Sequence, residues 1–170
     1  MQGRLKKLFK GKLLQLYTQT KFLPNGRHVT LEFIRHPGAA LIVPFLEEET
    51  VILIRQFRPV IDSFIYELPA GTLEDKESPL HCARREIIEE TGYSADKFSK
   101  LGAIYPVPGY STEKITVFKA EGLKKEKSNL EEDEIIEVCK VRGPEVRKLF
   151  RKGDIIDAKT ICAFSMCGWL

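Results

Sequence analysis

Four carboxylates and an arginine lie at fixed spacing in the segment between Gly71 and Tyr93: Glu77, Arg85, Glu86, Glu89 and Glu90. Carboxylates on one helix face repel each other unless a cation lies among them. Mg²⁺ and Mn²⁺ take oxygen ligands and often share carboxylates with substrate phosphates. The spacing therefore indicates a divalent-metal site for phosphate chemistry.

A helix is expected to hold these carboxylates. Ser78 is a typical N-cap, Pro79 suits the first helical position, and Gly92 is the expected end. At 100° per residue, Glu86 and Glu90 lie about 40° apart at the edge of an apolar face. That face is formed by Leu80, Ala83, Ile87, Ile88 and Thr91. The helix is therefore predicted to pack on a sheet and to hold its carboxylates where core meets solvent.

The alternative is a solvated acidic face paired with Arg84 and Arg85, because exposed charge pairs are common on helices. Against it stands the complete order of residues: a glycine, a glutamate six positions later, then the cluster REIIEE at residues 85–90 and a closing glycine. We therefore favour the metal site.

The flanking sequence predicts the elements that position this helix. Apolar runs indicate strands at 39–45, 50–57, 62–68, 98–104, 115–120 and 135–141, and helices are expected at 144–152 and from 158 to about 168. The segment 123–134 is expected to be a charged, mobile excursion. This arrangement predicts an α/β domain over residues 37–170.

The first 36 residues predict a separate β region. Segments 12–22 and 28–35 alternate apolar and polar residues around the turn sequence PNGR, which favours an antiparallel hairpin or meander. The basic start LKKLFKGKLL is expected to be solvated rather than to lie on a membrane. A sheet this small has little core of its own, so it is predicted to pack on the main domain or on a second subunit.

Composition restricts the class of protein. The chain has 170 residues, a net charge of +3 and basic residues in every part, which does not favour nucleic-acid binding. The apolar runs are far shorter than a membrane span. Its four cysteines lack metal-ligand spacing: Cys82, Cys139, Cys162 and Cys167. We therefore expect reduced thiols in a cytoplasmic protein.

The carboxylate segment resembles the Nudix box at every defined position: Gly71, Glu77, Arg85, Glu86, Ile87, Glu89, Glu90, Gly92 and Tyr93. The resemblance implies the Nudix fold, an α/β/α sandwich around a mixed β-sheet, and hydrolysis of a nucleoside diphosphate linked to another group. It implies Mg²⁺, with Mn²⁺ as a substitute, held by Glu86, Glu89, Glu90 and the Ala70 carbonyl. Gly71, Glu77, Arg85 and Gly92 match structural positions of the box.

Residues outside the box resemble the ADP-ribose pyrophosphatase subgroup. The similar segments are RQFR at 55–58, ELPAG at 67–71, HPGAA at 36–40 and DAKT at 157–160. The resemblance implies that Arg58 and Arg55 meet the diphosphate. It also implies that Glu67 either touches the terminal ribose or holds an arginine.

A loop rich in proline and glycine follows the box, and such a stiff loop is typical of a binding site. Its Pro108 and Gly109 match the subgroup's substrate loop, and Glu113 matches a glutamate that helps to activate water. The alternative is that Glu113 is an exposed loop carboxylate without a catalytic role. With the box glutamates Glu86, Glu89 and Glu90, Glu113 completes the set of expected catalytic residues.

The expected reaction is hydrolysis of ADP-ribose to AMP and ribose 5-phosphate. GDP-mannose or another nucleotide sugar is the nearest alternative, and a non-catalytic nucleotide-binding module or an RNA-decapping role ranks lower. The subgroup exchanges its N-terminal strands between two subunits, which implies a homodimer. Tyr17, Phe22 and Phe33 are unranked candidates for stacking on the base.

Overall fold

The computed structural model describes residues 3–11, 14–128 and 134–170. The strands are β1 (Lys6–Lys10), β2 (Gln15–Phe22), β3 (His28–Ile34), β4 (Ala39–Glu47), β5 (Thr50–Arg58), β6 (Ser63–Glu67), β7 (Ala70–Thr72), β8 (Tyr93–Ile104), β9 (Ile115–Lys125) and β10 (Ile136–Arg142). The helices are α1 (Pro79–Thr91), α2 (Gly143–Lys152) and α3 (Ala158–Met166), with a 3₁₀ turn η1 at Pro59–Ile61.

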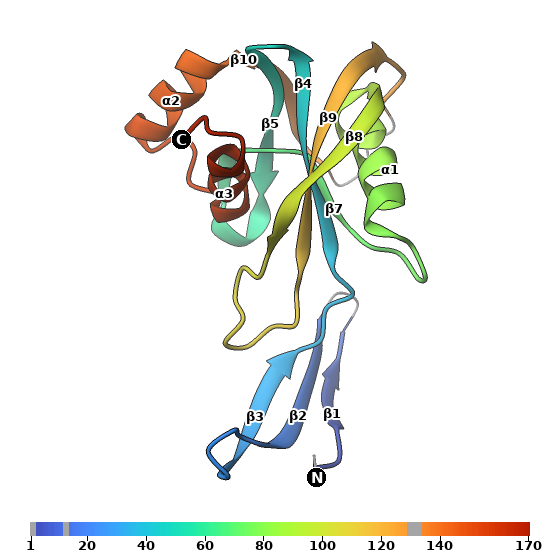
Figure 1. Ribbon diagram of the computed structural model, residues 1–170, viewed down its shortest axis with the longest axis vertical. Helices are drawn as coiled ribbons and strands as arrows, with labels where there is room; N and C mark the ends of the chain where they lie inside the picture. The colour runs from blue at the N-terminus through green and yellow to red at the C-terminus, as the bar shows by residue number, and fades with distance from the viewer. Residues whose placement is uncertain (1–2, 12–13, 129–133) are drawn as a thin grey trace.

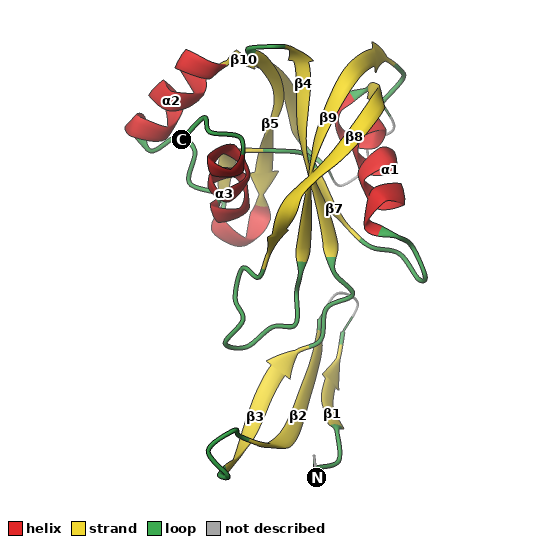
Figure 2. Cartoon of the chain, in the orientation of Figure 1, coloured by secondary structure: helices red, strands yellow, loops and turns green. Residues whose placement is uncertain are grey.

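A mixed sheet forms the main body, with strand order β10-β5-β4-β9-β8. Strands β4 and β9 run parallel, whereas the other neighbouring strands are antiparallel. β6 pairs with β5 and β7 pairs with β4. Helix α1 covers one face of the sheet, and α2 and α3 cover the other (Figures 1 and 2). The expected α/β/α sandwich is confirmed.

Strand β4 explains how two layers of helices are held on one sheet. Its Leu41 and Val43 pack into the core on the side of α3, whereas Ala40 and Ile42 pack with Ile87 on the side of α1. A strand covered on both faces requires a continuous apolar run, which the sequence AALIVPF supplies. Each such fully buried aliphatic side chain contributes about 1.5–3 kcal/mol.

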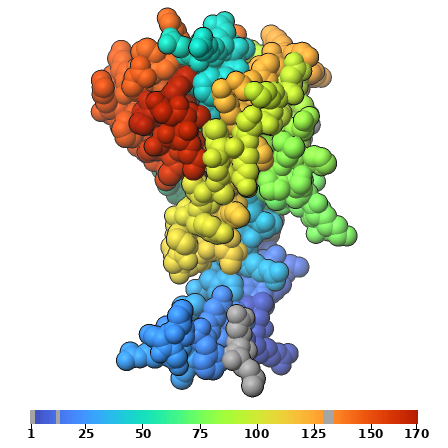
Figure 3. All heavy atoms as spheres, viewed as in Figure 1, coloured from blue at the N-terminus to red at the C-terminus, as the bar shows by residue number. Residues whose placement is uncertain are grey.

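Strands β1, β2 and β3 form a second sheet that extends from one end of the body (Figure 3). Tyr17 is its one buried hydrophobic side chain among the described residues. The basic chain start, for which no strand was expected, forms β1 at Lys6–Lys10 and pairs with β2, and its residues are exposed, in agreement with the expected solvated start. The division into an N-terminal region and a catalytic domain stays a prediction.

Two further local expectations were wrong. The sequence around Gly71 favours a glycine turn, but Ala70–Thr72 forms the short strand β7, since β4 offers a free edge for pairing. Strand β9 continues to Lys125, into the segment expected to be a mobile excursion, because β8 extends beside it. Residues 129–133 of that segment lie outside the described part of the chain. In the described part, no helix is both long enough and apolar enough to cross a membrane.

Candidate active site

Helix α1 begins and ends where its capping residues predict. The Ser78 side chain accepts a hydrogen bond from the backbone N–H of His81, and Pro79 follows in the first turn. Gly92 closes the helix with φ of 69°, a left-handed conformation that favours glycine, and its N–H donates to the Ile88 carbonyl. These caps set the two ends of α1, and the packing of Ala83 and Ile87 on the sheet sets its rotation and hence the positions of its carboxylates.

Strand β7 lies directly against two of these carboxylates. The backbone N–H of Ala70 donates to Oε2 of Glu90 at 2.9 Å, and Glu90 is 3% exposed. A Cβ atom at Gly71 would come within 1.6 Å of Oε1 of Glu86. The glycine of the box is thus needed for close approach of a carboxylate to the strand, and β7 and α1 form one side of a compact acidic site.

Burial and mutual repulsion make this acidic site unfavourable without a cation. Burial raises the pKa of Glu90 well above its ordinary value, and the charge of Glu86 raises it further. Burial also raises the pKa of Glu86, although Arg85 partly offsets this effect. A divalent cation among these oxygens would relieve both costs.

Arg85 is the internal partner of the carboxylates. Its Nη1 donates to Glu86 Oε1 at 2.7 Å and to Glu89 Oε2 at 2.9 Å. Its Nε and Nη2 donate to the two carboxylate oxygens of Glu77 at 3.2 and 3.1 Å. Nη2 also reaches the Thr72 carbonyl at 3.3 Å. Arg85 therefore connects the helix, the preceding loop and strand β7, and its structural role in the box stays a prediction.

The donor set fits a hard divalent cation. Within the described ranges, no three His, Cys, Asp or Glu side chains are already gathered as a metal site. The reason is visible in the contacts, since Glu86 and Glu89 bind Arg85 while Glu90 binds a backbone N–H. Glu90 is buried and Glu86 and Glu89 are half-buried, and these carboxylates can supply the oxygen ligands that Mg²⁺ and Mn²⁺ prefer. Their role as ligands, with the Ala70 carbonyl, stays a prediction.

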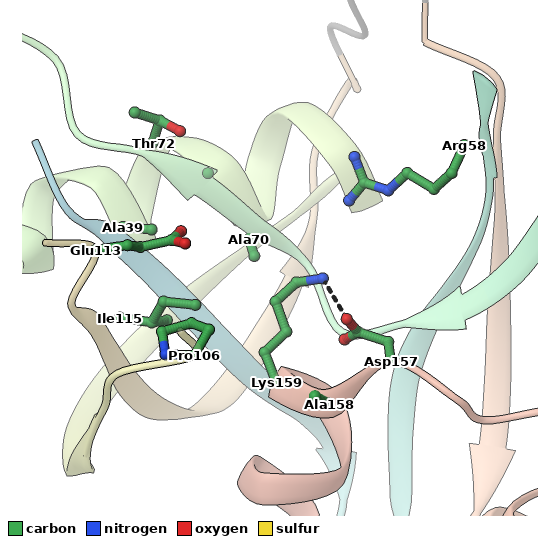
Figure 4. Close-up of a pocket in the computed structure, with 11 residues that line it drawn as sticks. Ala39, Arg58, Ala70, Thr72, Pro106, Glu113, Ile115, Asp157, Ala158 and Lys159 are labelled. Atoms are coloured by element: carbon green, nitrogen blue, oxygen red, sulfur yellow. Dashed lines mark hydrogen bonds and ion pairs between the residues drawn. The ribbon is translucent and has the colours of Figure 1, made fainter. Parts of the chain in front are cut away.

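A cavity of about 360 Å³ opens beside the acidic site. It is lined by Ala39, Arg58, Ala70, Gly71, Thr72, Pro106, Glu113, Ile115, Asp157, Ala158 and Lys159. Glu113 points into it from one side, and Arg58 points toward it from the opposite side (Figure 4). The cavity therefore joins the box to residues far away in sequence, with Glu113 and Arg58 on opposite sides.

The basic wall depends on a buried glutamate. Arg58 donates from Nε and Nη2 to the two oxygens of Glu67 at 2.6 and 2.8 Å, and Lys159 also binds Glu67. Burial alone would raise the pKa of Glu67, but the hydrogen bond from Arg58 and the charge of Lys159 lower it overall. Of the two expected roles for Glu67, the structure shows it holding an arginine.

Lys159 and Asp157 are cavity residues that the sequence did not assign to the site, although Asp157 was expected to cap the last helix. Asp157 caps α3 by accepting the N–H of Thr160, and it also binds Nζ of Lys159 at 2.9 Å. The hydroxyl of Thr160 in turn accepts the backbone N–H of Leu68. The segment DAKT therefore attaches α3 beside the strand that carries Glu67. The short sequence carried no signal of this beyond its resemblance to the subgroup.

The other expected substrate residues lie apart from the cavity wall. Arg55 binds Glu137 at 3.1 Å and lies over the ring of Phe64, with its guanidinium carbon 4.3 Å from the ring centroid. Pro108 and Gly109 do not line the cavity either, although Pro106 of the same loop does. Substrate contacts by Arg55, Pro108 and Gly109 stay predictions.

Glu134 is an acidic residue near the site that the sequence did not single out. Its charge raises the pKa of both Glu86 and Glu90, so it lies within electrostatic reach of them. The Phe57 N–H donates to the Ile135 carbonyl, which places residue 134 beside the end of β5. The signal was an acidic run immediately before a strand, but such runs are usually solvated.

The fold and the carboxylate box place the chain in the Nudix family: residues 35–164 match the NUDIX domain. The chain is similar to the ADP-ribose pyrophosphatase of Bacillus subtilis (strain 168), with 41% identity over 158 residues, 92% of this chain and 85% of the relative. It is 39% identical over 144 residues to the GDP-mannose pyrophosphatase of Cronobacter sakazakii (strain ATCC BAA-894), covering 79% of this chain and 75% of the relative.

The fold is also found in a solved structure described as an ADP compounds hydrolase. The two match with a TM-score of 0.85 and 22% sequence identity, over 98% of this chain and 91% of the other. At this identity the likeness supports the fold, including the N-terminal sheet, and the sequence relatives support the family.

Proposed function

We propose that this protein hydrolyses the diphosphate linkage of ADP-ribose to AMP and ribose 5-phosphate with Mg²⁺ as cofactor. The observation that carries the proposal is one cavity with the box strand β7 on one wall and Arg58 and Lys159 on another. The ADP-ribose pyrophosphatase relative, which aligns over most of both chains, supports the substrate. The complete set of box carboxylates favours an enzyme over a non-catalytic nucleotide-binding module.

In this proposal the side chains divide the work of binding and proton transfer. Arg58 and Lys159 neutralise the negative diphosphate, and Glu67 keeps both cations in place. Water attacks one phosphorus, the bond to the bridging oxygen breaks, and a carboxylate oxygen of Glu113 accepts the proton of the water. When bound by Glu86, Glu89 and Glu90, the divalent cation supplies polarisation of the phosphorus–oxygen bonds.

A substrate panel tests this proposal. Wild-type protein is incubated with ADP-ribose, GDP-mannose, NADH, diadenosine polyphosphates and dNTPs, with Mg²⁺ or Mn²⁺, and the products are identified. AMP and ribose 5-phosphate from ADP-ribose as the preferred substrate are expected. GDP-mannose is the second candidate because a relative of 39% identity carries that activity in its name. Nucleotide binding without turnover would instead favour the non-catalytic module.

Two carboxylates from different loops compete for the role of proton acceptor. Glu113 lines the cavity, whereas the charge of Glu134 raises the pKa of Glu86 and Glu90. We expect Glu113→Gln to lower kcat at least about tenfold, ~1.4 kcal/mol of barrier. We expect Glu134→Gln to raise the Mg²⁺ concentration needed for half-maximal rate, with a smaller change in kcat at saturating metal. If instead Glu134→Gln lowered kcat at saturating metal and Glu113→Gln raised the Mg²⁺ requirement, Glu134 would be the proton acceptor.

We also propose that two copies pair through the N-terminal sheet. This sheet exposes Leu8, Phe9 and Phe22 while burying little of its own surface, which is unfavourable for an isolated three-stranded sheet. Its charge is complementary to the body: residues 1–36 contain eight Lys or Arg and one Glu, whereas the rest of the chain is net acidic. The basic residues are thus less evenly spread than the overall charge indicates.

Sedimentation of the purified chain tests the pairing. We expect the wild type to sediment as a dimer and Phe9→Glu to shift it toward the monomer, because a buried charge opposes association. Ile156→Glu is the matched control, since Ile156 is equally exposed but lies on the main body. A dimer that survives Phe9→Glu would place the interface elsewhere. We further propose a cytoplasmic enzyme, consistent with its free cysteines, acting without nucleic-acid or membrane partners.

A further inference from the structure

The segment that joins the two sheets is attached to the loop that carries Glu113. The Ile34 N–H donates to the Tyr110 carbonyl at 2.8 Å, and the Thr112 N–H donates to the Ile34 carbonyl at 3.0 Å. The His36 N–H donates to Oγ1 of Thr112 at 2.9 Å. These contacts hold residues 34–36 and 110–112 together, so the position of the loop depends on the connecting segment.

The ring of His36 is oriented within this attachment. Its Nδ1 accepts a hydrogen bond from the backbone N–H of Gly38 at 3.1 Å. Gly38 has φ of 111°, in the left-handed region that favours glycine, so the sequence HPG permits this turn. Because Nδ1 is an acceptor, the proton of the neutral ring lies on Nε2. The N–H donor of the ring is thus directed away from Gly38.

That donor faces Glu113. Nε2 of His36 lies 3.9 Å from Oε1 of Glu113, and both side chains are mostly shielded from solvent. The distance is too long for a direct hydrogen bond but short enough for electrostatic attraction between the ring N–H and the carboxylate. Catalytic hydrogen bonds often shorten when substrate binds. The backbone N–H of Glu113 donates to Oγ of Ser111 at 3.1 Å, which fixes the backbone before the carboxylate.

We infer that His36 is a positioning residue that directs the carboxylate of Glu113 into the cavity through its Nε2–H. This inference rests on the proposed hydrolytic function. It assigns a role to the HPG sequence beyond joining the two sheets. The inference also connects the N-terminal sheet to the site, because residues 34–36 continue directly from β3.

Two substitutions of His36 test the roles of the two ring nitrogens separately. Asparagine places its amide near the position of Nδ1, so His36→Asn keeps a partner for Gly38 but removes the group that faces Glu113. Glutamine reaches near the position of Nε2, so His36→Gln keeps a donor toward Glu113 but leaves the Gly38 N–H without its acceptor. His81→Asn is the matched control, because His81 is an exposed histidine of α1.

Steady-state hydrolysis of ADP-ribose by these variants tests the inference. His36→Asn is expected to lower kcat about tenfold with KM changed less than about threefold, a loss similar to the one expected for Glu113→Gln. His36→Gln is expected to retain at least a third of wild-type kcat, and His81→Asn to match the wild type. The double variant His36→Asn/Glu113→Gln should be no slower than Glu113→Gln alone, since coupled residues are not additive. Wild-type rates in His36→Asn, or losses that multiply in the double variant, would overturn the inference.

A readout without catalysis separates this inference from the proposed function. Nitrogen-15 NMR of the histidine rings should show the Nε2-protonated form of His36, and its Nε2 signal should shift in Glu113→Gln but not in Glu137→Gln. If ADP-ribose is not hydrolysed and this shift is present, the proposed function fails while the contact stands. An unchanged His36 signal in Glu113→Gln would refute the contact itself.

Discussion

Glu90→Gln is expected to abolish nearly all metal-dependent hydrolysis, lowering kcat about 10³-fold, ~4 kcal/mol of barrier. Glu90 is almost fully buried and binds the backbone of Ala70, so no other side chain can take its place without moving β7. A neutral amide keeps the size of the side chain but removes the charge that a divalent cation requires. The measurement is initial rate against Mg²⁺ and Mn²⁺ concentration, with metal affinity determined separately by calorimetry.

Glu74→Gln is the matched control for Glu90→Gln. Glu74 lies in the same box, but it is largely exposed and reaches Arg85 only at 3.9 Å. We expect its rate and metal affinity to stay within about twofold of the wild type, because exposed pairs contribute little. Near-normal turnover in Glu90→Gln, or an equal loss in Glu74→Gln, would show that the assignment of the metal site is wrong.

The second large effect is expected on stability. Glu67→Gln should lower the free energy of unfolding by ~2–3 kcal/mol, because it leaves Arg58 and Lys159 without the buried charge between them. We place the effect below that of a fully buried pair because Arg58 is partly exposed to solvent. Urea denaturation of the two proteins at neutral pH measures the difference.

The pH dependence of this effect follows from the lowered pKa of Glu67. A carboxylate with a lowered pKa in the folded state stabilises the fold above its ordinary pKa, and this contribution is lost as the pH falls. The difference between wild type and Glu67→Gln should therefore shrink below about pH 4. Glu137→Gln, which breaks the exposed pair with Arg55, should cost at most about 1 kcal/mol. Equal losses in both variants would contradict the buried network.

These two predictions concern the carboxylates that lie behind two walls of one cavity. The box supplies negative charge held by α1 and β7, whereas β5 and α3 supply positive charge held by Glu67. The acidic wall suits a divalent cation and the basic wall suits a diphosphate. Loss of Glu90 should therefore act on the reaction rate, and loss of Glu67 should act on folding and on the position of Arg58.

Much of the box was predictable because its signals are local. A cap, a proline and a glycine set the limits of α1, and the helical period then placed Glu86 and Glu90 at the edge of its buried face. Cys82 was missed from that face although it is fully buried, because it lies one turn before Glu86, at the edge where the carboxylates lie. The buried strand β4 was equally predictable from the sequence, since a strand covered on both faces must be a continuous apolar run.

Contacts between distant segments were not predictable in this way. The pairing of Lys159 with Glu67 spans 92 residues, and the contact of Thr112 with His36 spans 76. Apart from the resemblance that singled out Glu67, nothing in the local sequence distinguishes these side chains from ordinary surface residues. Their roles appear only when α3 packs beside β6 and when the loop before β9 meets the segment after β3.

The sequence by itself determined the family, the reaction class and the carboxylates of the box, because these depend on residue types at short, fixed spacing along one helix. The tertiary structure decided which basic side chains lie near those carboxylates. It also placed Arg55 outside the cavity wall and Glu134 within electrostatic reach of the site. The physical reason is that charges act through space. A separation of many residues along the chain says nothing about distance until the sheet and its two helical layers have formed.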